Sequence, residues 1–370
     1  MNIPFIDLAR QFQAIEADVR SRIDAVLAHG QYIMGPEVKE LETALADFVG
    51  EGRECITCAS GTEALLIALM ALEIGPGDEV ITSPFTFAST AEMIALVGAT
   101  PVFVDVRLGN ANLDEDLVEA AITPKTRAIM PVSLYGQTCD MDRLNEIAAR
   151  HGDVVVIEDA AQSFGAHYKG RKSCALSKIG TTSFFPSKPL GCYGDGGAIF
   201  TDDPEIAQAA REIRVHGQSA RYVHSRIGVG GRMDTLQCAI VLAKLERFAF
   251  ELEARERIGN RYRDSLVDLA PDLQLIQVGN DRNSVWGQFT VRVPDRDRVI
   301  ASLSQASIPT AIHYPVPLNR QPAYRHFGDP DATPNCAQLS TEVMSLPMSA
   351  DLSEAQQDIV IHEVRKCFGK

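Results

Sequence analysis

The sequence predicts an α/β protein with a mostly parallel central sheet in a large domain and a smaller α+β domain at the C-terminal end. Between about residues 54 and 160, short apolar segments alternate with helical segments, a pattern typical of β-α units around a parallel sheet. The 370 residues also exceed what one compact core requires. Because the alternation changes near residue 250, we place the large domain at residues 1–249 and the small one at 250–370.

The N-terminal segment predicts an amphipathic helix, because apolar residues recur there at steps of three or four. These residues are Leu8, Phe12, Ile15, Val19, Ile23 and Leu27. A second helix is expected after the segment GQYIMGPEV, residues 30–38.

The alternating region supplies the elements of the predicted sheet. Strands are expected at residues 55–59, 79–83, 101–106, 128–134 and 154–159, and helices at 63–72, 91–98, 115–122 and 141–150. Two more strand-like segments, 180–185 and 197–203, flank a glycine-rich loop. A charged helical stretch at 233–266 leads into the small domain, where strands near 286–293 and 344–348 accompany a helix near 298–307.

Composition and charge argue against several classes of protein. The chain is 45% apolar and 23% charged, which is ordinary for a soluble globular protein. It has no apolar run long enough to span a membrane and no N-terminal pattern of a secretory signal. A net charge of −14 disfavours nucleic acid and anionic lipid as partners. We therefore expect a cytoplasmic protein that binds neither a membrane nor nucleic acid.

The eight cysteines are scattered and are expected to be thiols. Cys55 and Cys58 form a single C-x-x-C pair in a predicted strand, where residues three apart face opposite sides of the sheet. A zinc site requires further ligands at suitable spacing. Two packed thiols are the favoured interpretation, and no metal site is predicted.

Candidate site residues follow the predicted strands, at whose carboxyl ends doubly wound sheets bind ligands. In the first motif, Ser60, Gly61 and Thr62 open a helix after the strand at 55–59. Backbone N–H groups at a helix start, with two hydroxyls and a glycine beside them, can hold a phosphate group. Simple capping of the helix by a hydroxyl is the alternative.

The second motif places Glu158 and Asp159 at the end of an apolar strand. A carboxylate there can pair with a cation such as a protonated ring nitrogen, and Ala160 and Ala161 leave room for a flat ring. An aspartate that caps the next turn is the alternative.

The third motif centres on Lys188, which lies between Pro186 and Pro189 and follows Ser183 and Ser187. The prolines restrict the backbone on both sides, and a desolvated lysine amine forms Schiff bases with carbonyl compounds. A solvated surface lysine is the alternative. The glycines that follow do not match a dinucleotide-binding fingerprint, because they lead into a strand instead of a helix.

A fourth feature is the segment 211–232, whose five arginines and one glutamate give a local charge of +4. It suits a diphosphate or a carboxylate, while a solvated loop or a subunit contact is the alternative. Together the four features match the needs of pyridoxal 5'-phosphate, which requires a lysine, an acid for its ring nitrogen and a phosphate seat. Phe85 or Phe87 can supply a flat neighbour for its ring.

Motifs along nearly the whole chain resemble the DegT/DnrJ/EryC1/StrS family of sugar-nucleotide aminotransferases, which are fold-type I enzymes dependent on pyridoxal phosphate. They are FIDL (5–8), GQYIMGPEV (30–38), GDEVIT (77–82), IEDAAQSFGA (157–166), HYPVPL (313–318) and SLPM (345–348). Segments 133–137, 183–200 and 232–237 look most like the subgroup that aminates UDP-2-acetamido-2-deoxy-3-oxo-D-glucuronate. The resemblance implies a homodimer that transfers an amino group from L-glutamate to a UDP-linked keto sugar for surface polysaccharide such as O-antigen.

The resemblance also implies roles for single residues around the cofactor. Lys188 stands at the Schiff-base lysine, and Asp159 stands at the acid on the ring nitrogen. The remaining cofactor contacts are implied for Gln162 beside the ring hydroxyl, Phe87 stacked on the ring, and Gly61, Thr62 and Ser183 at the phosphate.

For the sugar nucleotide, the resemblance implies a site lined by Gly30, Tyr32, Ser187, His313 and Tyr314. Arg232, given by the partner subunit, would bind the carboxylate of the sugar through its guanidinium fork. Gly230 departs from the family pattern, which has an asparagine there that reaches the phosphate across the dimer. A water molecule or a backbone N–H would have to replace that contact.

The type of reaction follows from Lys188, because related dehydratases carry a histidine in its place. Transamination is therefore expected. Two alternatives stay open: amination of a neutral dTDP- or UDP-linked keto-deoxysugar at the 3- or 4-position, and a non-catalytic regulatory protein that binds the cofactor.

Overall fold

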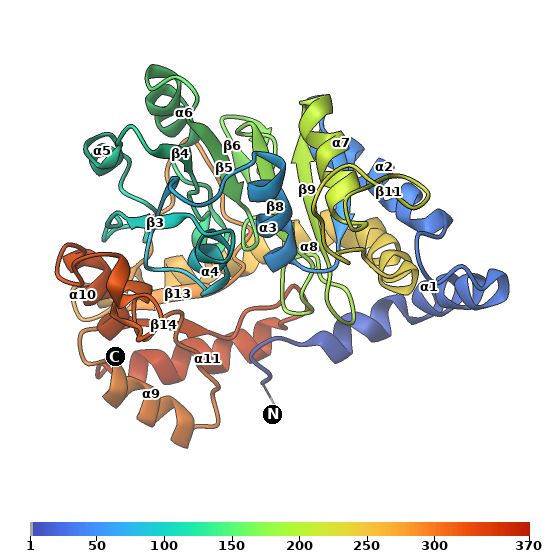
Figure 1. Ribbon diagram of the computed structural model, residues 1–370. Coiled ribbons are helices and arrows are strands. Elements are labelled where there is room, and N and C mark those ends of the chain that lie inside the picture. Colours follow the sequence, from blue (N-terminus) through green and yellow to red (C-terminus); the bar gives the residue numbers. More distant parts are fainter. Residues whose placement is uncertain (1–2) are drawn as a thin grey trace.

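The computed structural model describes residues 3–370, and its central layer is a seven-stranded sheet (Figure 1). In spatial order the strands are β1 (Glu54–Cys58), β9 (Gly197–Thr201), β8 (Ile179–Ser183), β5 (Val155–Asp159), β4 (Thr126–Ile129), β2 (Glu79–Thr82) and β3 (Thr100–Phe103). Every neighbouring pair is parallel except the two that β9 forms with β1 and β8. The mostly parallel sheet predicted from the sequence is confirmed.

Helices cover both faces of the sheet, because successive residues of a strand face opposite sides. Ile56 and Val80 pack against the helices of one face, and their neighbours Cys55 and Ile81 pack against those of the other. The first face carries α3 (Gly61–Ala71), α4 (Ser89–Leu96) and α7 (Pro204–Ile213), and the second carries α2 (Pro36–Val49), α5 (Glu115–Val118) and α6 (Met141–Arg150). Cys58 lies in the first of these clusters, so the two thiols of the C-x-x-C pair are buried on opposite faces.

Two long helices extend beyond the sheet. The predicted N-terminal helix is α1 (Leu8–His29), whose first turn is capped by the side chain of Asp7. The predicted charged helix is α8 (Thr235–Leu266), 32 residues long. Apolar residues of α1, including Ile15 and Val19, pack against α8, and α8 continues into the C-terminal part of the chain (Figure 1).

The C-terminal part has a separate antiparallel sheet in the order β12-β13-β14. Its elements are β12 (Gln274–Leu275), β13 (Phe289–Arg292), β14 (Val343–Leu346), α9 (Arg296–Gln305), α10 (Pro334–Glu342) and α11 (Glu354–Lys366). Residues from the end of α8, such as Ile258 and Tyr262, join its apolar core. The predicted boundary at 249/250 falls inside α8 and stays a prediction.

Several short elements complete the chain. Two-stranded hairpins are formed by β6 (His167–Tyr168) with β7 (Arg171–Lys172) and by β10 (Gln218–Ala220) with β11 (Val223–His224). Single 3-10 turns lie at Glu119–Ala121, Leu134–Gly136, Val267–Leu269, Leu318–Arg320 and Arg325–Phe327. The helix expected at 115–122 is thus shorter than predicted, because α5 ends at Val118 and a 3-10 turn follows it.

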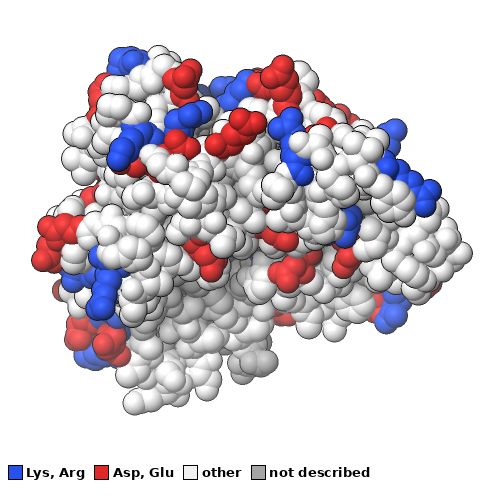
Figure 2. Space-filling model, viewed as in Figure 1, with Lys and Arg blue, Asp and Glu red and all other residues white. Residues whose placement is uncertain are grey.

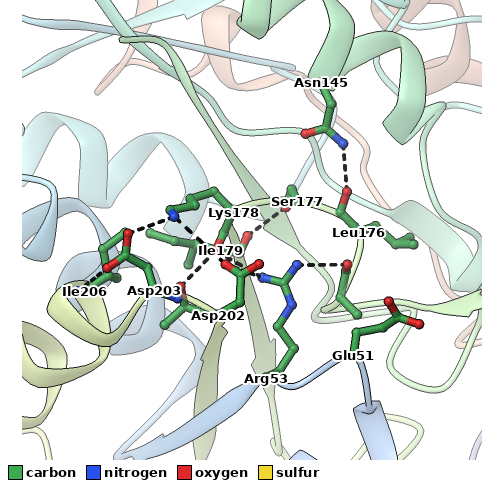
Figure 3. A network of polar contacts seen from close by, with 12 residues as sticks. Glu51, Arg53, Asn145, Leu176, Ser177, Lys178, Ile179, Asp202, Asp203 and Ile206 are labelled. Atoms are coloured by element: carbon green, nitrogen blue, oxygen red, sulfur yellow. Dashed lines mark hydrogen bonds and ion pairs between the residues drawn. The ribbon is translucent and has the colours of Figure 1, made fainter.

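A polar network closes the edge of the sheet at which β1 and β8 begin and β9 ends (Figure 3). The guanidinium of Arg53 donates to the backbone carbonyls of Lys178, at 3.2 Å, and Ala175, at 3.1 Å, and its Nη1 lies 3.5 Å from Oδ1 of Asp202. The ammonium of Lys178 lies 2.7 Å from Oδ2 of Asp203. This network lies at the edge opposite the one where β1 and β8 end, at Cys58 and Ser183.

The surface carries charges of both signs. On the face shown in Figure 2, Lys and Arg side chains are interspersed with Asp and Glu, and no extended basic area forms on that face. Among residues 3–370, no helix is both long and apolar enough to cross a membrane.

Candidate active site

Three strands of the sheet deliver the predicted cofactor residues to one edge. β1, β5 and β8 are parallel to one another and end at Cys58, Asp159 and Ser183. β9 runs the other way and therefore begins at this edge with Gly197, directly between β1 and β8. The motifs around residues 60, 159 and 183 thus meet at the carboxyl edge, as expected for a doubly wound sheet.

The predicted phosphate seat is formed where α3 follows β1. Ser60 caps the helix, with its Oγ accepting a hydrogen bond from the N–H of Glu63 at 3.1 Å. Gly61 faces Ser183 so closely that a Cβ atom at position 61 would lie 2.5 Å from the Cβ of Ser183. Thr62 is half-buried, and within residues 3–370 its hydroxyl has no hydrogen-bond partner. The capping alternative is therefore observed at Ser60, while the Thr62 hydroxyl and the first N–H groups of α3 are available to an anion.

Asp159 is buried, with 5% of its surface exposed. Its Oδ1 accepts a hydrogen bond from the N–H of Ala161 and its Oδ2 one from the hydroxyl of Thr90, both at 3.1 Å. Burial raises the pKa of Asp159, and these two bonds and the charge of Lys188 oppose the rise. A buried carboxylate with only two hydrogen-bond donors favours a cation beside it. Asp159 can therefore accept the bond from Ala161 in the local turn and also pair with a protonated ring nitrogen.

Thr90 was not predicted from the sequence. It is fully buried in α4, and the hydroxyl of Thr86 lies 3.3 Å from its own. A threonine in a short helix has no sequence signal that distinguishes this role from ordinary packing.

Lys188 lies in a turn after β8, where its backbone N–H donates to the carbonyl of Phe185 at 2.9 Å. Burial is the main cause of its lowered pKa, which the charge of Asp159 partly restores. The pKa of His313 is also lowered, first by burial and then by the charge of Lys188. The charges of Lys188 and Asp159 act on each other, and that of Lys188 acts on His313, so the lysine lies close to both groups and is not an ordinary solvated surface charge. A lowered pKa increases the fraction of neutral amine, which is the form of lysine that acts as a nucleophile.

Gln162 holds a fixed orientation between two tyrosines. Its Oε1 accepts a hydrogen bond from the backbone N–H of Tyr135 at 2.8 Å, and its Nε2 donates to the hydroxyl oxygen of Tyr314 at 3.2 Å. Burial, followed by the charge of Asp159, raises the pKa of Tyr314. Tyr135 was not predicted, although it lies within the SLYGQ motif.

Aromatic side chains adjoin this group. Phe85 is 1% exposed and Phe87 is 58% exposed, and their ring centroids lie 6.3 and 6.4 Å from that of Tyr314. Of the two rings, only that of Phe87 is exposed enough to stack on a cofactor, and Phe87 is the residue for which the resemblance implies this role. The Nδ1 of His313 lies 3.2 Å from the hydroxyl of Ser345.

The other predicted sugar-nucleotide residues are less directly placed. Gly30 ends α1 in a left-handed conformation with φ 71°, and Tyr32 is half-exposed, with its carbonyl bonded to the N–H of Thr235 at 3.0 Å. Ser187 is half-buried in the turn before Lys188. In the part of the chain from residue 3 onward, no hydrogen bond or ion pair joins Gly30, Tyr32 or Arg232 to Lys188 or Asp159, so their roles stay predictions.

Most of the basic segment 211–232 is neutralised within the chain. Arg211 pairs with Glu54, Arg214 with Glu42, and Arg226 with Glu212. Among residues 3–370, Arg221 and Arg232 form no ion pair, so the segment offers an anion far less charge than its composition suggests.

Gly230, the departure from the family pattern, lies against a histidine ring. A Cβ atom at position 230 would lie 3.1 Å from Cε1 of His216. The carbonyl of the next residue, Gly231, accepts a hydrogen bond from the N–H of Ala59 at 2.9 Å. The segment that carries Gly230 therefore lies beside the start of α3, and an asparagine at 230 would require the histidine to move.

The residues present fit pyridoxal 5'-phosphate. Gly61 has no side chain and approaches Ser183 at the start of α3, where backbone N–H groups can bind a phosphate. Asp159 is a buried acid suited to a protonated ring nitrogen, and Lys188 is an amine with a lowered pKa beside it.

Comparisons with known proteins agree with this geometry. The DegT/DnrJ/EryC1/StrS aminotransferase family model matches residues 13–365. The UDP-2-acetamido-2-deoxy-3-oxo-D-glucuronate aminotransferase of Pseudomonas aeruginosa is 55% identical over 359 residues, which cover 97% of this chain and 98% of that protein. The crystal structure of a DegT DnrJ EryC1 StrS aminotransferase from Brucella abortus has a TM-score of 0.96 and 42% identity, and each chain is covered completely. NtdA of Bacillus subtilis, solved with bound cofactor PMP, has a TM-score of 0.92 and 28% identity over 100% of this chain and 86% of that one.

Proposed function

The chain belongs to the DegT/DnrJ/EryC1/StrS aminotransferase family, and from this premise we propose that it aminates UDP-2-acetamido-2-deoxy-3-oxo-D-glucuronate at the 3-oxo group with L-glutamate as donor. The enzyme is a transaminase that uses pyridoxal 5'-phosphate. The observation that carries the proposal is that buried Asp159, held at the end of β5 by Thr90 and Ala161, lies near Lys188, an amine of lowered pKa, at the carboxyl edge of the sheet.

The side chains of the pocket have distinct tasks in this proposal. When bound, the cofactor supplies an electron sink for the carbon atom that loses its proton. Asp159 keeps a proton on the ring nitrogen, and Lys188 carries the proton that moves at the substrate carbon. Gln162 holds the ring hydroxyl, and Phe87 covers one ring face. Gly61, Thr62 and Ser183 hold the phosphate.

The choice of substrate rests on similarity and on one unpaired arginine. The relative from Pseudomonas aeruginosa covers almost the whole chain at 55% identity. Arg232 has no ion-pair partner in the described chain, and a guanidinium suits the carboxylate of a sugar acid. We propose that it acts across a homodimer, together with Gly30, Tyr32, Ser187, His313 and Tyr314 of the sugar-nucleotide site.

The proposal also covers the pathway and the compartment in which the enzyme acts. A product that is a 3-amino sugar nucleotide would serve surface polysaccharide such as O-antigen, and the reaction would take place in the cytoplasm. Gly230 leaves the partner's usual contact with the phosphate to a water molecule or a backbone N–H.

The test is to load the purified enzyme with L-glutamate and offer keto-sugar nucleotides one at a time. Mass spectrometry should find an added amino group on the 3-oxo uronate. Amination of only neutral dTDP- or UDP-linked keto-deoxysugars would refute the proposed substrate. A visible spectrum that does not respond to glutamate would instead indicate a non-catalytic protein that binds the cofactor.

A further inference from the structure

Tyr135 is a buried residue that contacts the candidate site on two sides. Only 2% of its surface is exposed. Its backbone N–H donates to Oε1 of Gln162 at 2.8 Å, and its hydroxyl donates to the backbone carbonyl of His313. One residue therefore joins the amide proposed for the cofactor to the C-terminal segment proposed for the sugar nucleotide.

The backbone of Tyr135 is in an unusual conformation, with φ 59° and ψ 2°. Bulky residues rarely adopt this left-handed region, and such residues cluster at functional sites. The turn is held on both sides: the N–H of Ser133 donates to the carbonyl of Asp159 at 2.9 Å, and the carbonyl of Gly136 accepts from the N–H of Val285 at 2.9 Å. The strained turn is thus fixed to the strand that ends in the predicted acid.

The backbone N–H of Tyr135 fixes the orientation of the Gln162 amide and, through it, the direction in which the Tyr314 hydroxyl can donate. A backbone N–H can only donate, so the atom of Gln162 that faces Tyr135 is its oxygen, and the amide nitrogen must face Tyr314. The hydroxyl oxygen of Tyr314 accepts from that nitrogen, which leaves its own proton free to donate elsewhere. Within residues 3–370, no other group accepts this proton.

We propose that Tyr135 is a positioning residue that fixes the His313–Tyr314 backbone and orients the Tyr314 hydroxyl as a hydrogen-bond donor to the sugar nucleotide. The proposal deepens the proposed function and rests on it for the identity of the ligand. The coupling between Tyr135 and the segment after residue 310 can be tested without any substrate.

The first experiment compares Tyr135→Phe with Tyr262→Phe. The first variant removes the bond to His313 but keeps the ring and the backbone N–H. The control removes an equally buried hydroxyl that donates to the carbonyl of Pro347 at 3.0 Å and, among the described residues, makes no hydrogen bond to residues 311–320. In the holoenzyme, amide hydrogen exchange of a peptide covering 311–320 should become up to about tenfold faster in Tyr135→Phe only. Equal exchange in Tyr135→Phe and wild type overturns the proposal.

The second experiment measures binding of UDP-2-acetamido-2-deoxy-D-glucuronate by calorimetry. This probe has a hydroxyl in place of the 3-oxo group and cannot be aminated. Tyr135→Phe and Tyr314→Phe should each weaken its binding about tenfold. In Tyr135→Phe, the rate of the glutamate-dependent change in the visible spectrum should stay within about twofold of wild type. A spectral rate that falls as much as the affinity contradicts a role confined to the sugar nucleotide.

The two experiments separate this proposal from the proposed function. If the wild-type enzyme neither binds the probe nor aminates the 3-oxo uronate, the proposed substrate is wrong. The exchange measurement still decides whether Tyr135 positions the His313–Tyr314 segment.

Discussion

The hydroxyl of Thr90 donates a hydrogen bond to Oδ2 of Asp159 at 3.1 Å. With Oδ1 bonded to the N–H of Ala161, both carboxylate oxygens are held, and the acid is aimed from the end of its strand. Burial raises the pKa of Asp159 and the bond from Thr90 lowers it. Thr90 therefore helps to keep this acid ionised.

Replacement of Thr90 by valine should raise the pKa of Asp159 further, because the volume is kept and the donor is lost. We expect kcat to fall about tenfold and the acidic limb of the kcat profile to move to higher pH. Thr181→Val is the matched control, because that buried hydroxyl bonds to the carbonyl of Glu158 instead of the carboxylate of Asp159. A Thr90→Val profile that overlays the wild type would exclude this role.

Asp159→Asn should stabilise the cofactor-free protein and inactivate the enzyme. The folded pKa of Asp159 is raised, so its contribution to stability is present below the unfolded pKa and is lost as pH rises through the folded pKa. The variant should therefore have a higher Tm than wild type at pH 7, and the gain should vanish below about pH 4. Activity should fall at least about 100-fold. A lower Tm at pH 7 would contradict the cost assigned to the buried charge.

Lys188→Ala should bind the cofactor without turnover, because the phosphate seat and Asp159 remain while the amine is lost. Absorbance after gel filtration measures retention of the cofactor, and product formation should be undetectable. Lys178→Ala is the control, since that lysine pairs with Asp203 at the opposite edge of the sheet. Full activity in Lys188→Ala would rule out the assignment.

Gly61→Ala should weaken cofactor binding at least about tenfold, because the new methyl group would lie 2.5 Å from the Cβ of Ser183. The same overlap should lower the free energy of unfolding by about 1–3 kcal/mol. In Gly75→Ala the nearest atom, the carbonyl oxygen of Val97, would be 3.6 Å away, so binding should not change. Titration with cofactor and chemical denaturation measure the two effects. Equal affinity in both variants would disprove the close fit.

Arg232→Ala should lower kcat/KM for the 3-oxo uronate about 10- to 100-fold more than for the matching neutral 3-oxo sugar. Arg221→Ala, which alters the other arginine of the segment without an ion pair, should leave the ratio unchanged. Steady-state kinetics with both substrates give the comparison. An equal loss on the two sugars would show that Arg232 does not bind the carboxylate.

The order of strands and helices was largely predictable, because strands buried on both faces appear as continuous apolar segments and helices as apolar residues at regular spacing. The short elements were not predictable. The segment 115–122 has helical composition, yet the helix ends at Val118. Local propensity does not determine such ends.

The candidate residues for the chemistry could be proposed from their type and position in the sequence, whereas the residues that contact and orient them could not. Lys188 and Asp159 each had an ordinary alternative in the sequence, a solvated lysine and a capping aspartate, and the combination of motifs and the resemblance selected them. Thr90 contacts Asp159, and Tyr135 contacts Gln162 and His313, through hydrogen bonds that depend on the path of the backbone. The charge of the segment 211–232 was also misleading in isolation, because its acidic partners Glu42 and Glu54 lie far away in the sequence.

The polar network around Arg53 and Lys178 lies at the edge of the sheet opposite the candidate active site. It lies at one end of β8, and Ser183 lies at the other end, five residues away. Five residues of strand span about 16 Å, a distance over which the effects of substitutions usually add independently. Heat resistance can therefore be engineered at the Arg53 edge, and sugar preference at the Ser183 edge, without one undoing the other.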